Sequence, residues 1–517
     1  MAANFILELQ LNISPKDRHY NDMALEYGRH IYNATLKYAL NHWNSMKQLK
    51  IYKLLLSEYQ KVKNSKNKND ETYKQCISDD LAELRIRYKL SKFQLEAYAT
   101  KYKNNHNYDK YLDSNSVLNI AGNVWQAIEG LIFYKSKRVH FCKYGDFNTL
   151  IGKTNKQGIR FIKIGEKVRR KPSEINKVVW CGREMSVKIR KTDIYAQEVL
   201  ATKKVKFCKI VRKLIKGRFK YYVQLVFDGV PPAKRNRDGS FRHKVDVNSR
   251  VGLDIGTTTL ATVSEKSVSL EKLGDDEIVE INKEINRLHR KLDRSRRATN
   301  SKNFNKDGTI KKGIKLKWYR SNSYMKTLFK LKEKYRLKSV KLKLSHNRLA
   351  NCILELGCNI HVENMSFKAL VKKSKETKIS EKTGKIKSKK RYGKSITNFA
   401  PGTFIEILDR KLKYIDKSLN KVNTQTFKAS QYNHHTNKYI KKKLSNRWNY
   451  IDKFKIQRDL YSAFLLMNSK NNLKTTDRTL CIENFDNFVK LHDSEISRLE
   501  IYIDKLPTSF GIKQEVS

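Results

Sequence analysis

One aspartate stands inside an otherwise apolar stretch of the chain. Asp254 lies in the run Val251-Gly-Leu-Asp-Ile-Gly, which has the pattern of a buried β-strand. Burying an ionised carboxylate without a partner is expensive, so this strand can fold only where a cation or an opposing charge meets Asp254. Because a single strand aspartate is more often a salt-bridged core residue than a metal ligand, the interpretation depends on whether further acids converge on it.

Two further acids occupy positions from which they could meet Asp254. Glu363 ends the segment Ile360-His-Val-Glu, and Asp459 opens a predicted helix in Gln457-Arg-Asp-Leu-Tyr-Ser-Ala-Phe. Phosphodiester hydrolysis on the ribonuclease H fold needs acids from the first strand, the end of a later strand and a late helix, which together hold two metal ions. Mg²⁺ prefers oxygen ligands. We therefore expect Asp254, Glu363 and Asp459 to be catalytic and to bind Mg²⁺, with Mn²⁺ as an alternative.

The charge of the chain favours a polyanionic partner. The 517 residues include 109 Lys and Arg but only 51 Asp and Glu, which gives a formal net charge of +58. Self-repulsion makes such an excess a burden for folding, whereas a nucleic acid that releases its counterions on binding would explain it. The basic residues run along the whole chain rather than along one amphipathic helix, which argues against a membrane surface as the partner.

The first half of the chain changes its periodicity twice. Residues 4–13 alternate as a half-buried strand, and the pattern from about Asp17 to Lys135 is helical, with little Gly or Pro. Residues 139–228 again indicate β-structure, most clearly a hairpin around Lys216-Gly217. The N-terminal strand could join this sheet, which would make the helical block an insertion into a basic barrel. The polar segment 231–248 is typical of a linker.

The second half contains a predicted helical hairpin with a basic end. Residues 278–292 carry apolar side chains at spacings of three and four, and a returning helix runs from Tyr324 to about Leu356. Five arginines near the end of the first helix are predicted nucleic-acid contacts: Arg287, Arg290, Arg294, Arg296 and Arg297. For Trp318 and Tyr319, packing in a core is favoured over stacking on unpaired bases. The lysine-rich segment 372–394 has few apolar residues and indicates a solvated loop.

Cysteine usage indicates a reducing compartment. The seven cysteines are odd in number, scattered and without a CxxC pair, which argues against a disulfide framework and a conventional zinc ribbon. No signal peptide or membrane span is apparent, so we expect a cytoplasmic, nucleoid-associated prokaryotic protein that needs no membrane.

Three motifs resemble those of one family. Gly252-Leu-Asp-Ile-Gly-Thr, Val362-Glu-Asn-Met and Arg458-Asp-Leu-Tyr-Ser-Ala resemble the three RuvC motifs of the TnpB nucleases of insertion sequences and of compact type V CRISPR effectors. The resemblance covers nearly the whole chain. It implies an RNA-guided DNA endonuclease whose partners are a guide RNA (scaffold plus guide) and a target DNA with a short adjacent motif. We expect the chain to act as a monomer.

The resemblance implies a multidomain α/β fold. A ribonuclease H-like (RuvC) domain follows a β-barrel wedge domain that carries an inserted helical recognition domain. The expected bounds are residues 1–15 and 136–249 for the wedge, 16–135 for the recognition domain, 250–428 and 456–517 for the RuvC domain, and 429–455 for a degenerate zinc module.

The expected zinc module departs from the family pattern. Where the family has a T-S-Q-x-C signature, this chain has Ala429-Ser-Gln-Tyr-Asn-His-His, and no cysteine follows before Asp459. Two adjacent histidines supply too few ligands for a tetrahedral site, so no zinc is expected. We interpret His434 and His435 as surface or RNA-contacting residues, and add Gln431 and Arg458 to the predicted nucleic-acid contacts.

Three other functions fit parts of the sequence. The run Asp254-Ile-Gly-Thr-Thr-Thr also matches a phosphate-binding turn of sugar kinases and actin-like ATPases, but a second glycine-rich loop is missing and the charge has no role there. An RNA-guided repressor with little cleavage would keep the binding properties, although all three acids are retained. A transposase is the least supported, because no Tyr or Ser recombinase constellation is present.

Overall fold

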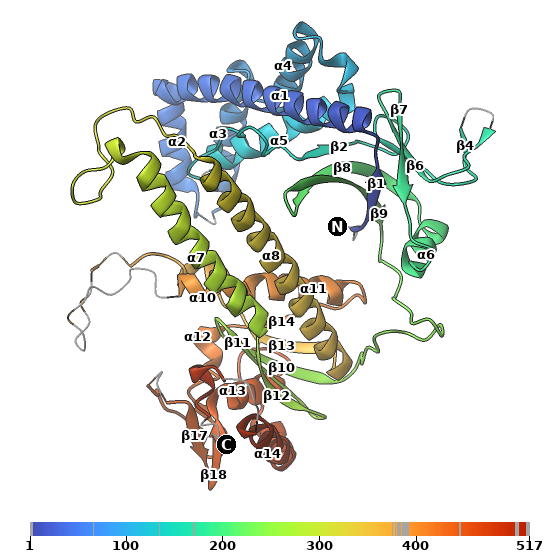
Figure 1. Ribbon diagram of the computed structural model, residues 1–517. Helices are drawn as coiled ribbons and strands as arrows, with labels where there is room; N and C mark the ends of the chain where they lie inside the picture. Colours follow the sequence, from blue (N-terminus) through green and yellow to red (C-terminus); the bar gives the residue numbers. More distant parts are fainter. Residues whose placement is uncertain are drawn as a thin grey trace. The chain divides into compact units, whose positions relative to one another are not determined.

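A computed structural model provides the structure of the chain. It describes residues 4–512 except 66, 134, 169–170, 375, 378, 380–383, 385–391, 444–445 and 502–505. The chain divides into two compact units, Met1–Pro232 and Ala233–Ser517, which are coloured blue to green and green to red in Figure 1. The division places the predicted linker mainly with the second unit, where the Asp246 N–H donates to the Leu354 carbonyl at 3.0 Å.

The helical block of the first unit forms as predicted. Its helices are α1 (Pro15–Gln48), α2 (Lys50–Val62), α3 (Lys68–Arg87), α4 (Lys92–Asn105) and α5 (Ser114–Ile132), with a 3₁₀ turn η1 (Tyr108–Lys110). Ser14 caps α1 through the Asp17 N–H, and Asp113 caps α5 through the Ser116 N–H. Trp43, Leu84 and Val124 belong to one buried cluster that joins α1, α3 and α5.

The strands of the first unit form a seven-stranded sheet in the order β2-β8-β9-β1-β7-β6-β3. The strands are β1 (Asn4–Asn12), β2 (Thr149–Ile151), β3 (Arg160–Ile162), β6 (Lys177–Trp180), β7 (Arg183–Lys188), β8 (Val205–Ile215) and β9 (Arg218–Asp228). The N-terminal strand pairs antiparallel with β9, with Leu7 opposite Leu225, so it does join the later sheet. Alternate residues of β1 are buried, as the sequence pattern predicts.

Two details of this sheet differ from the expectation. No pairing among the described strands joins β2 to β3, so the sheet is not a closed barrel. Helix α6 (Ile194–Thr202) interrupts a region that was expected to be entirely β, and a separate two-stranded ribbon consists of β4 (Lys167–Val168) and β5 (Lys171–Pro172). The predicted hairpin is correct: Lys216 and Gly217 both have positive φ, 49° and 77°, as a tight two-residue turn requires.

A five-stranded sheet organises the second unit, in the order β12-β11-β10-β13-β14. The strands are β10 (Arg250–Ile255), β11 (Thr259–Ser264), β12 (Val268–Lys272), β13 (Asn359–Glu363) and β14 (Asn420–Val422). Strand β11 is antiparallel to β10 and β12, whereas β13 is parallel to β10 and β14. The prediction included β10, β11 and β13 but not the outer strands β12 and β14.

Helices cover both faces of this sheet (Figure 1). They are α8 (Asn322–Leu356), α11 (Pro401–Lys413), α13 (Arg458–Met467) and α14 (Arg478–Glu500), whereas α7 (Asp276–Thr299) packs on α8. Val251 and Leu253 of β10 share a core with α8 and α11. Ala261 and Val263 of β11 share another with α13 and α14. The second unit also contains α9 (Phe367–Leu370), α10 (Gly393–Phe399), α12 (Thr424–Phe427), η2 (Ser301–Asn303), η3 (Thr508–Phe510), and strands β15 (Tyr432–Asn433), β16 (Lys438–Tyr439), β17 (Trp448–Ile451) and β18 (Phe454–Gln457).

Helices α7 and α8 form the predicted antiparallel hairpin. Ile281 and Ile285 of α7 pack with Leu331 of α8 in a separate small core, and ion pairs such as Lys334–Glu284 join the two helices. Much of the predicted lysine-rich loop, residues 372–394, lies outside the described residues. Within the described part of the chain, no helix is both long and apolar enough to cross a membrane.

Gly252 permits direct backbone contact between β10 and α13. A Cβ atom at this position would overlap the Ala463 carbonyl oxygen and would lie 2.5 Å from the Met467 amide nitrogen. Both are backbone atoms, so no side-chain rotation can make room for even one methyl group. The glycine of the first motif is therefore required by the approach of a helix to a strand.

We predict that Gly252→Ala destabilises the protein by about 1–3 kcal/mol or more, because the added methyl group forces α13 away from the sheet. Thermal unfolding of the purified chain measures the effect. Gly402→Ala is the matched control, since its Cβ would meet only the Phe367 ring at 3.8 Å. Equal stability of the two variants would contradict the proposed packing constraint.

Candidate catalytic site

Strand register brings Asp254 and Glu363 together. Leu253 of β10 pairs in parallel with Val362 of β13, and each acid is the next residue along its strand. Parallel neighbours lie about 4.8 Å apart, and side chains at matching positions point to the same face. Since Leu253 and Val362 face the core shared with α8 and α11, Asp254 and Glu363 face the opposite side, where α13 lies.

Helix α13 brings the third acid to this face. Ala463 of α13 lies over Gly252, and Asp459 is one helical turn earlier, about 6 Å along the axis. On the strand below, Asp254 is two residues beyond Gly252, a step of about 6.6 Å. These steps match, so Asp459 comes close to Asp254. The effect is electrostatic as well: Asp459 and Glu363 both raise the pKa of Asp254.

The environment of the two strand acids is unfavourable for their charges. Burial is the main reason that the pKa of Asp254 is well above its ordinary value, followed by repulsion from Asp459 and Glu363, which Arg458 partly opposes. Burial also raises the pKa of Glu363. Among the described residues, neither the Asp254 nor the Glu363 carboxylate has a hydrogen bond or an ion pair, whereas Asp459 does. Both strand acids therefore lack a positively charged partner in direct contact.

Asp459 has cationic partners. The Arg458 guanidinium donates to one of its carboxylate oxygens through Nε at 3.2 Å and NH2 at 3.0 Å. Arg447 lies 3.7 Å from the other oxygen. The role of Arg458 as a nucleic-acid contact stays a prediction, and no sequence pattern pointed to Arg447.

The donor chemistry fits a hard divalent cation, because three carboxylates converge and two of them lack a partner. Their placement does not yet form a binding cluster. Among the residues that the structure describes, no group of three or more His, Cys, Asp or Glu side chains is arranged to hold a metal ion. The contacts of Asp459 with two arginines offer a physical reason, since its oxygens are directed to guanidinium groups.

The start of α13 is fixed by buried polar residues that sequence reasoning missed. The Gln457 side chain accepts from the Leu460 N–H at 2.8 Å and donates to the Phe510 carbonyl at 3.3 Å. His492 of α14 accepts from the Gln457 N–H at 3.0 Å. A glutamine is an unusual helix cap, and no local pattern connects it with a histidine far along the chain.

The segment 429–455 folds into small hairpins packed against α13. β15 pairs with β16, and β17 pairs with β18. The interpretation of His434 as a surface residue is wrong, because it is only 3% exposed. Its Nδ1 lies 2.8 Å from the Tyr461 hydroxyl, and its ring packs on Phe464 and Phe485. Adjacent His435 is exposed, and Gln431 is half-buried.

The predicted basic contacts lie along α7 and at the tip of the α7–α8 hairpin. Arg287, Arg290, Arg294 and Arg297 are exposed and Arg296 is half-buried. Arg296 and Arg297 both pair with Asp293, which offsets part of their charge. The expectation that Trp318 and Tyr319 pack in a core is wrong, because they are 40% and 66% exposed. The Arg296 guanidinium lies over the Trp318 ring, 5.3 Å from its centroid.

We predict that Asp254→Asn stabilises the metal-free protein by about 1 kcal/mol, because it removes a half-buried charge that its neighbours repel. An acid whose pKa is raised by folding binds its proton more tightly in the folded state. The wild type should therefore lose stability relative to the variant as the pH rises above about 4.

Thermal unfolding in a chelating buffer across this pH range measures the difference. Asp246→Asn is the control, since the Asp246 carboxylate pairs with Lys266 at 2.6 Å and accepts from Ser249, which lowers its pKa. That substitution should destabilise the protein. A fall in stability for Asp254→Asn would contradict the electrostatic description.

Comparison with known proteins gives similarities at the level of whole structures only. No protein-family model and no curated protein sequence matches the chain. One similar solved structure is the cryo-EM structure of a Cas12f1–sgRNA–target DNA complex, with a TM-score of 0.39 and 12% identity, covering 91% of this chain and 99% of that one. Another is a CRISPR-Cas12f ternary complex, with a TM-score of 0.26 and 14% identity, covering 88% and 82%. The description of the site therefore rests on its own residues.

Proposed function

We propose that the protein is an RNA-guided DNA endonuclease that hydrolyses phosphodiester bonds with Mg²⁺ at Asp254, Glu363 and Asp459. The observation that carries the proposal is the convergence of these acids from two adjacent strands and a helix start, with two half-buried carboxylates that lack an ion pair among the described residues. Such a concentration of like charge weakens a fold, and a bound cation is its simplest explanation.

Each acid has a role in holding metal. Asp254 and Glu363 are available as ligands, whereas Asp459 must exchange its contacts with Arg458 and Arg447 for the ion. Bound Mg²⁺ would activate a water molecule and stabilise the leaving oxygen of the cleaved strand. The two arginines, once released, would lie beside the scissile region, where guanidinium groups bind phosphate well. No zinc is required, and Mn²⁺ is a reasonable substitute for Mg²⁺.

Guide RNA and target DNA are the proposed partners. The net charge of +58 supports a polyanion. The choice of RNA guidance rests on the resemblance of the three motifs to TnpB and compact type V effectors, in which base pairing selects the target. Exposed arginines along α7, such as Arg287, Arg290 and Arg294, are suited to contact a phosphate backbone.

A guided repressor that binds DNA without cutting is a second candidate. The observation in its favour is the pairing of Asp459 with two arginines, together with the lack of a preformed metal cluster among the described side chains. The two candidates share their binding partners, so cleavage separates them. A sugar kinase or actin-like ATPase would instead leave the charge of the chain without a role.

We predict that the alanine variants of Asp254, Glu363 and Asp459 each lose DNA cleavage, by about a hundredfold or more, while their affinity for RNA and DNA changes little. Cleavage assays with Mg²⁺ and filter-binding assays on the same preparations measure both properties. Asp246→Ala is a control acid in the same unit outside the site. Cleavage at the wild-type rate in all three variants would contradict the proposed site, and a wild type that binds but never cuts would favour the repressor.

We predict that the position of DNA cleavage changes when the guide segment of the RNA is changed. RNA that co-purifies with the protein is sequenced, a scaffold carrying a new guide segment is prepared, and plasmid cleavage is mapped. Cleavage should require the scaffold RNA and should follow the new guide sequence. Cutting at one fixed sequence without RNA would reject guidance and leave the nuclease assignment in place.

A further inference from the structure

The first unit contains a groove whose residues are distant in sequence from the candidate catalytic acids. It has a volume of about 640 Å³ and lies between α1, α4 and the segment that follows α5. We call it the α1–α4 groove. Its walls include Lys37, Tyr38 and Asn41 of α1, Tyr98 and Tyr102 of α4, and Phe141. The volume falls in the range of about 300–1,000 Å³ that is typical of sites for small ligands or single nucleotides.

Aromatic rings dominate the walls of the groove. Tyr38 and Tyr98 stack on each other, with centroids 4.0 Å apart and planes at 17°. Tyr102 continues the row from Tyr98, at 6.4 Å and 30°. Phe141 is 51% exposed and borders the same groove. Tyr38 and Tyr98 cover one face of each other, and Tyr102 also stacks on His106, with centroids 4.0 Å apart. Because these tyrosine faces are already covered, the exposed Phe141 ring offers the flat face to a planar ligand.

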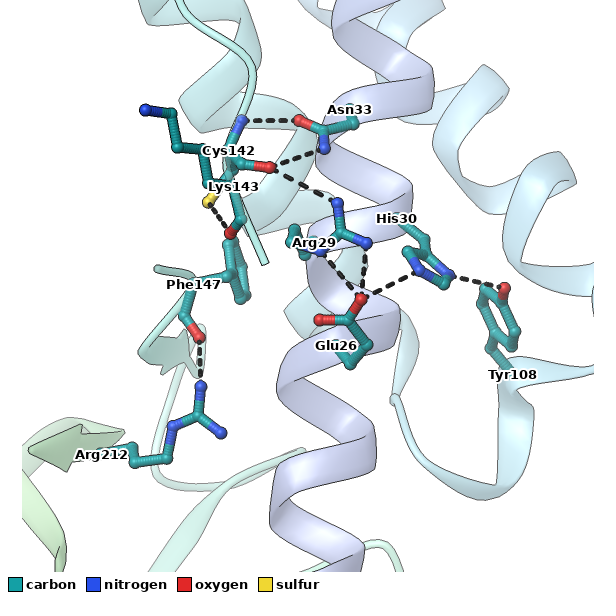
Figure 2. A network of polar contacts seen from close by, with 9 residues as sticks. All are labelled: Glu26, Arg29, His30, Asn33, Tyr108, Cys142, Lys143, Phe147 and Arg212. Carbon is teal, nitrogen blue, oxygen red and sulfur yellow. Dashed lines mark hydrogen bonds and ion pairs between the residues drawn. The ribbon is translucent and has the colours of Figure 1, made fainter. Parts of the chain in front are cut away.

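The position of Phe141 is fixed by polar contacts of its neighbour. The Asn33 amide donates to the Cys142 carbonyl at 2.9 Å and accepts from the Cys142 N–H at 2.8 Å. Arg29 donates to the same carbonyl at 3.4 Å. Figure 2 shows that Glu26 in turn holds Arg29, by a hydrogen bond of 2.5 Å, and His30, at 3.1 Å. The groove is therefore largely organised before any ligand binds, which lowers the entropic cost of binding.

The charge at the groove favours an anion. Glu26 offsets the charge of Arg29, but Lys37 is exposed and has no acidic partner in the described part of the chain. Asn41, also on the rim, adds an amide that can donate and accept hydrogen bonds. An exposed aromatic face, the Lys37 ammonium and the Asn41 amide are groups that can bind a base, a phosphate and a sugar hydroxyl, respectively.

We propose that the α1–α4 groove binds an unpaired nucleotide of an RNA strand, with its base on the Phe141 face beside the tyrosines and its phosphate at Lys37. RNA is favoured over DNA because proteins recognise RNA through unpaired bases on aromatic side chains, and because Asn41 and the tyrosine hydroxyls suit the 2′-hydroxyl. The proposal rests on the proposed RNA partner and adds a site for it outside the nuclease centre.

Photo-crosslinking tests the groove directly. The full chain, freed of co-purifying nucleic acid, is irradiated with a short single-stranded RNA that contains 4-thiouridine, and the crosslinked peptides are identified by mass spectrometry. Crosslinks should map to the peptides that carry Tyr98, Tyr102 or Phe141. Phe141→Ala should lower the yield about fivefold or more, because it removes the stacking surface for the base. Lys37→Glu should lower it to a similar extent, because it places a negative charge beside the phosphate.

Matched controls lie on another face of α4. Phe93 is 78% exposed, and Lys101 is exposed near it, and neither borders the groove. Phe93→Ala and Lys101→Glu should leave the groove crosslinks unchanged. Equal losses in the control and groove variants, or crosslinks only elsewhere on the chain, would overturn the proposal.

Two further results separate this proposal from the proposed function. A DNA strand with 4-thiothymidine that crosslinks to the groove as efficiently as RNA would overturn the choice of RNA. Strong RNA binding without groove crosslinks would reject the groove alone. If the wild type binds no RNA at all, both the groove and RNA guidance are rejected, while cleavage at the three acids is measured independently.

Discussion

The close contact between β10 and α13 is the constraint on which the candidate site depends. Gly252 lets the backbone of α13 lie on the strand without an intervening side chain. That distance and direction bring Asp459 over Asp254, and the parallel register of β10 with β13 adds Glu363. A side chain at position 252 would raise the helix, and the third acid would leave the other two. Gly252 and Asp254 of the first motif thus depend on the same packing of α13 against β10.

The rest of the second unit supports a site that is electrostatically unfavourable. Asp254 and Glu363 are half-buried among like charges, while Arg458 and Arg447 compensate Asp459. Such an arrangement persists only where other interactions hold the backbone in place. On the opposite face of the same strand, Val251 and Leu253 are buried in the core with α8 and α11. One strand therefore combines a stabilising apolar face with a destabilising acidic one.

Sequence patterns were informative where local periodicity decides the structure. The alternation in 4–13, the heptad-like spacing of α7 and the Lys216-Gly217 turn each reflect local chemistry, and these elements were predicted. The convergence of the three acids was inferred from the order of their motifs. Tertiary packing decides the rest. β14 is only three residues long, His434 is buried by aromatic rings from α13 and α14, and the Gln457–His492 contact joins distant segments. The exposure of Trp318 depends on a hairpin tip that has little core to cover it.

A chain rich in lysine has few apolar side chains with which to fix its loops, and asparagine amides take over part of this task. In three places within the described residues, one asparagine side chain accepts from the N–H and donates to the carbonyl of a single residue, as a neighbouring β-strand would. The pairs are Asn33 with Cys142, Asn155 with Phe161, and Asn300 with Tyr319. Each pair satisfies two backbone groups without burying apolar area. Two of them adjoin exposed aromatic residues, Phe141 and Tyr319. Because this pairing leaves no periodic trace in the sequence, the surfaces that it orders become visible only in the folded structure.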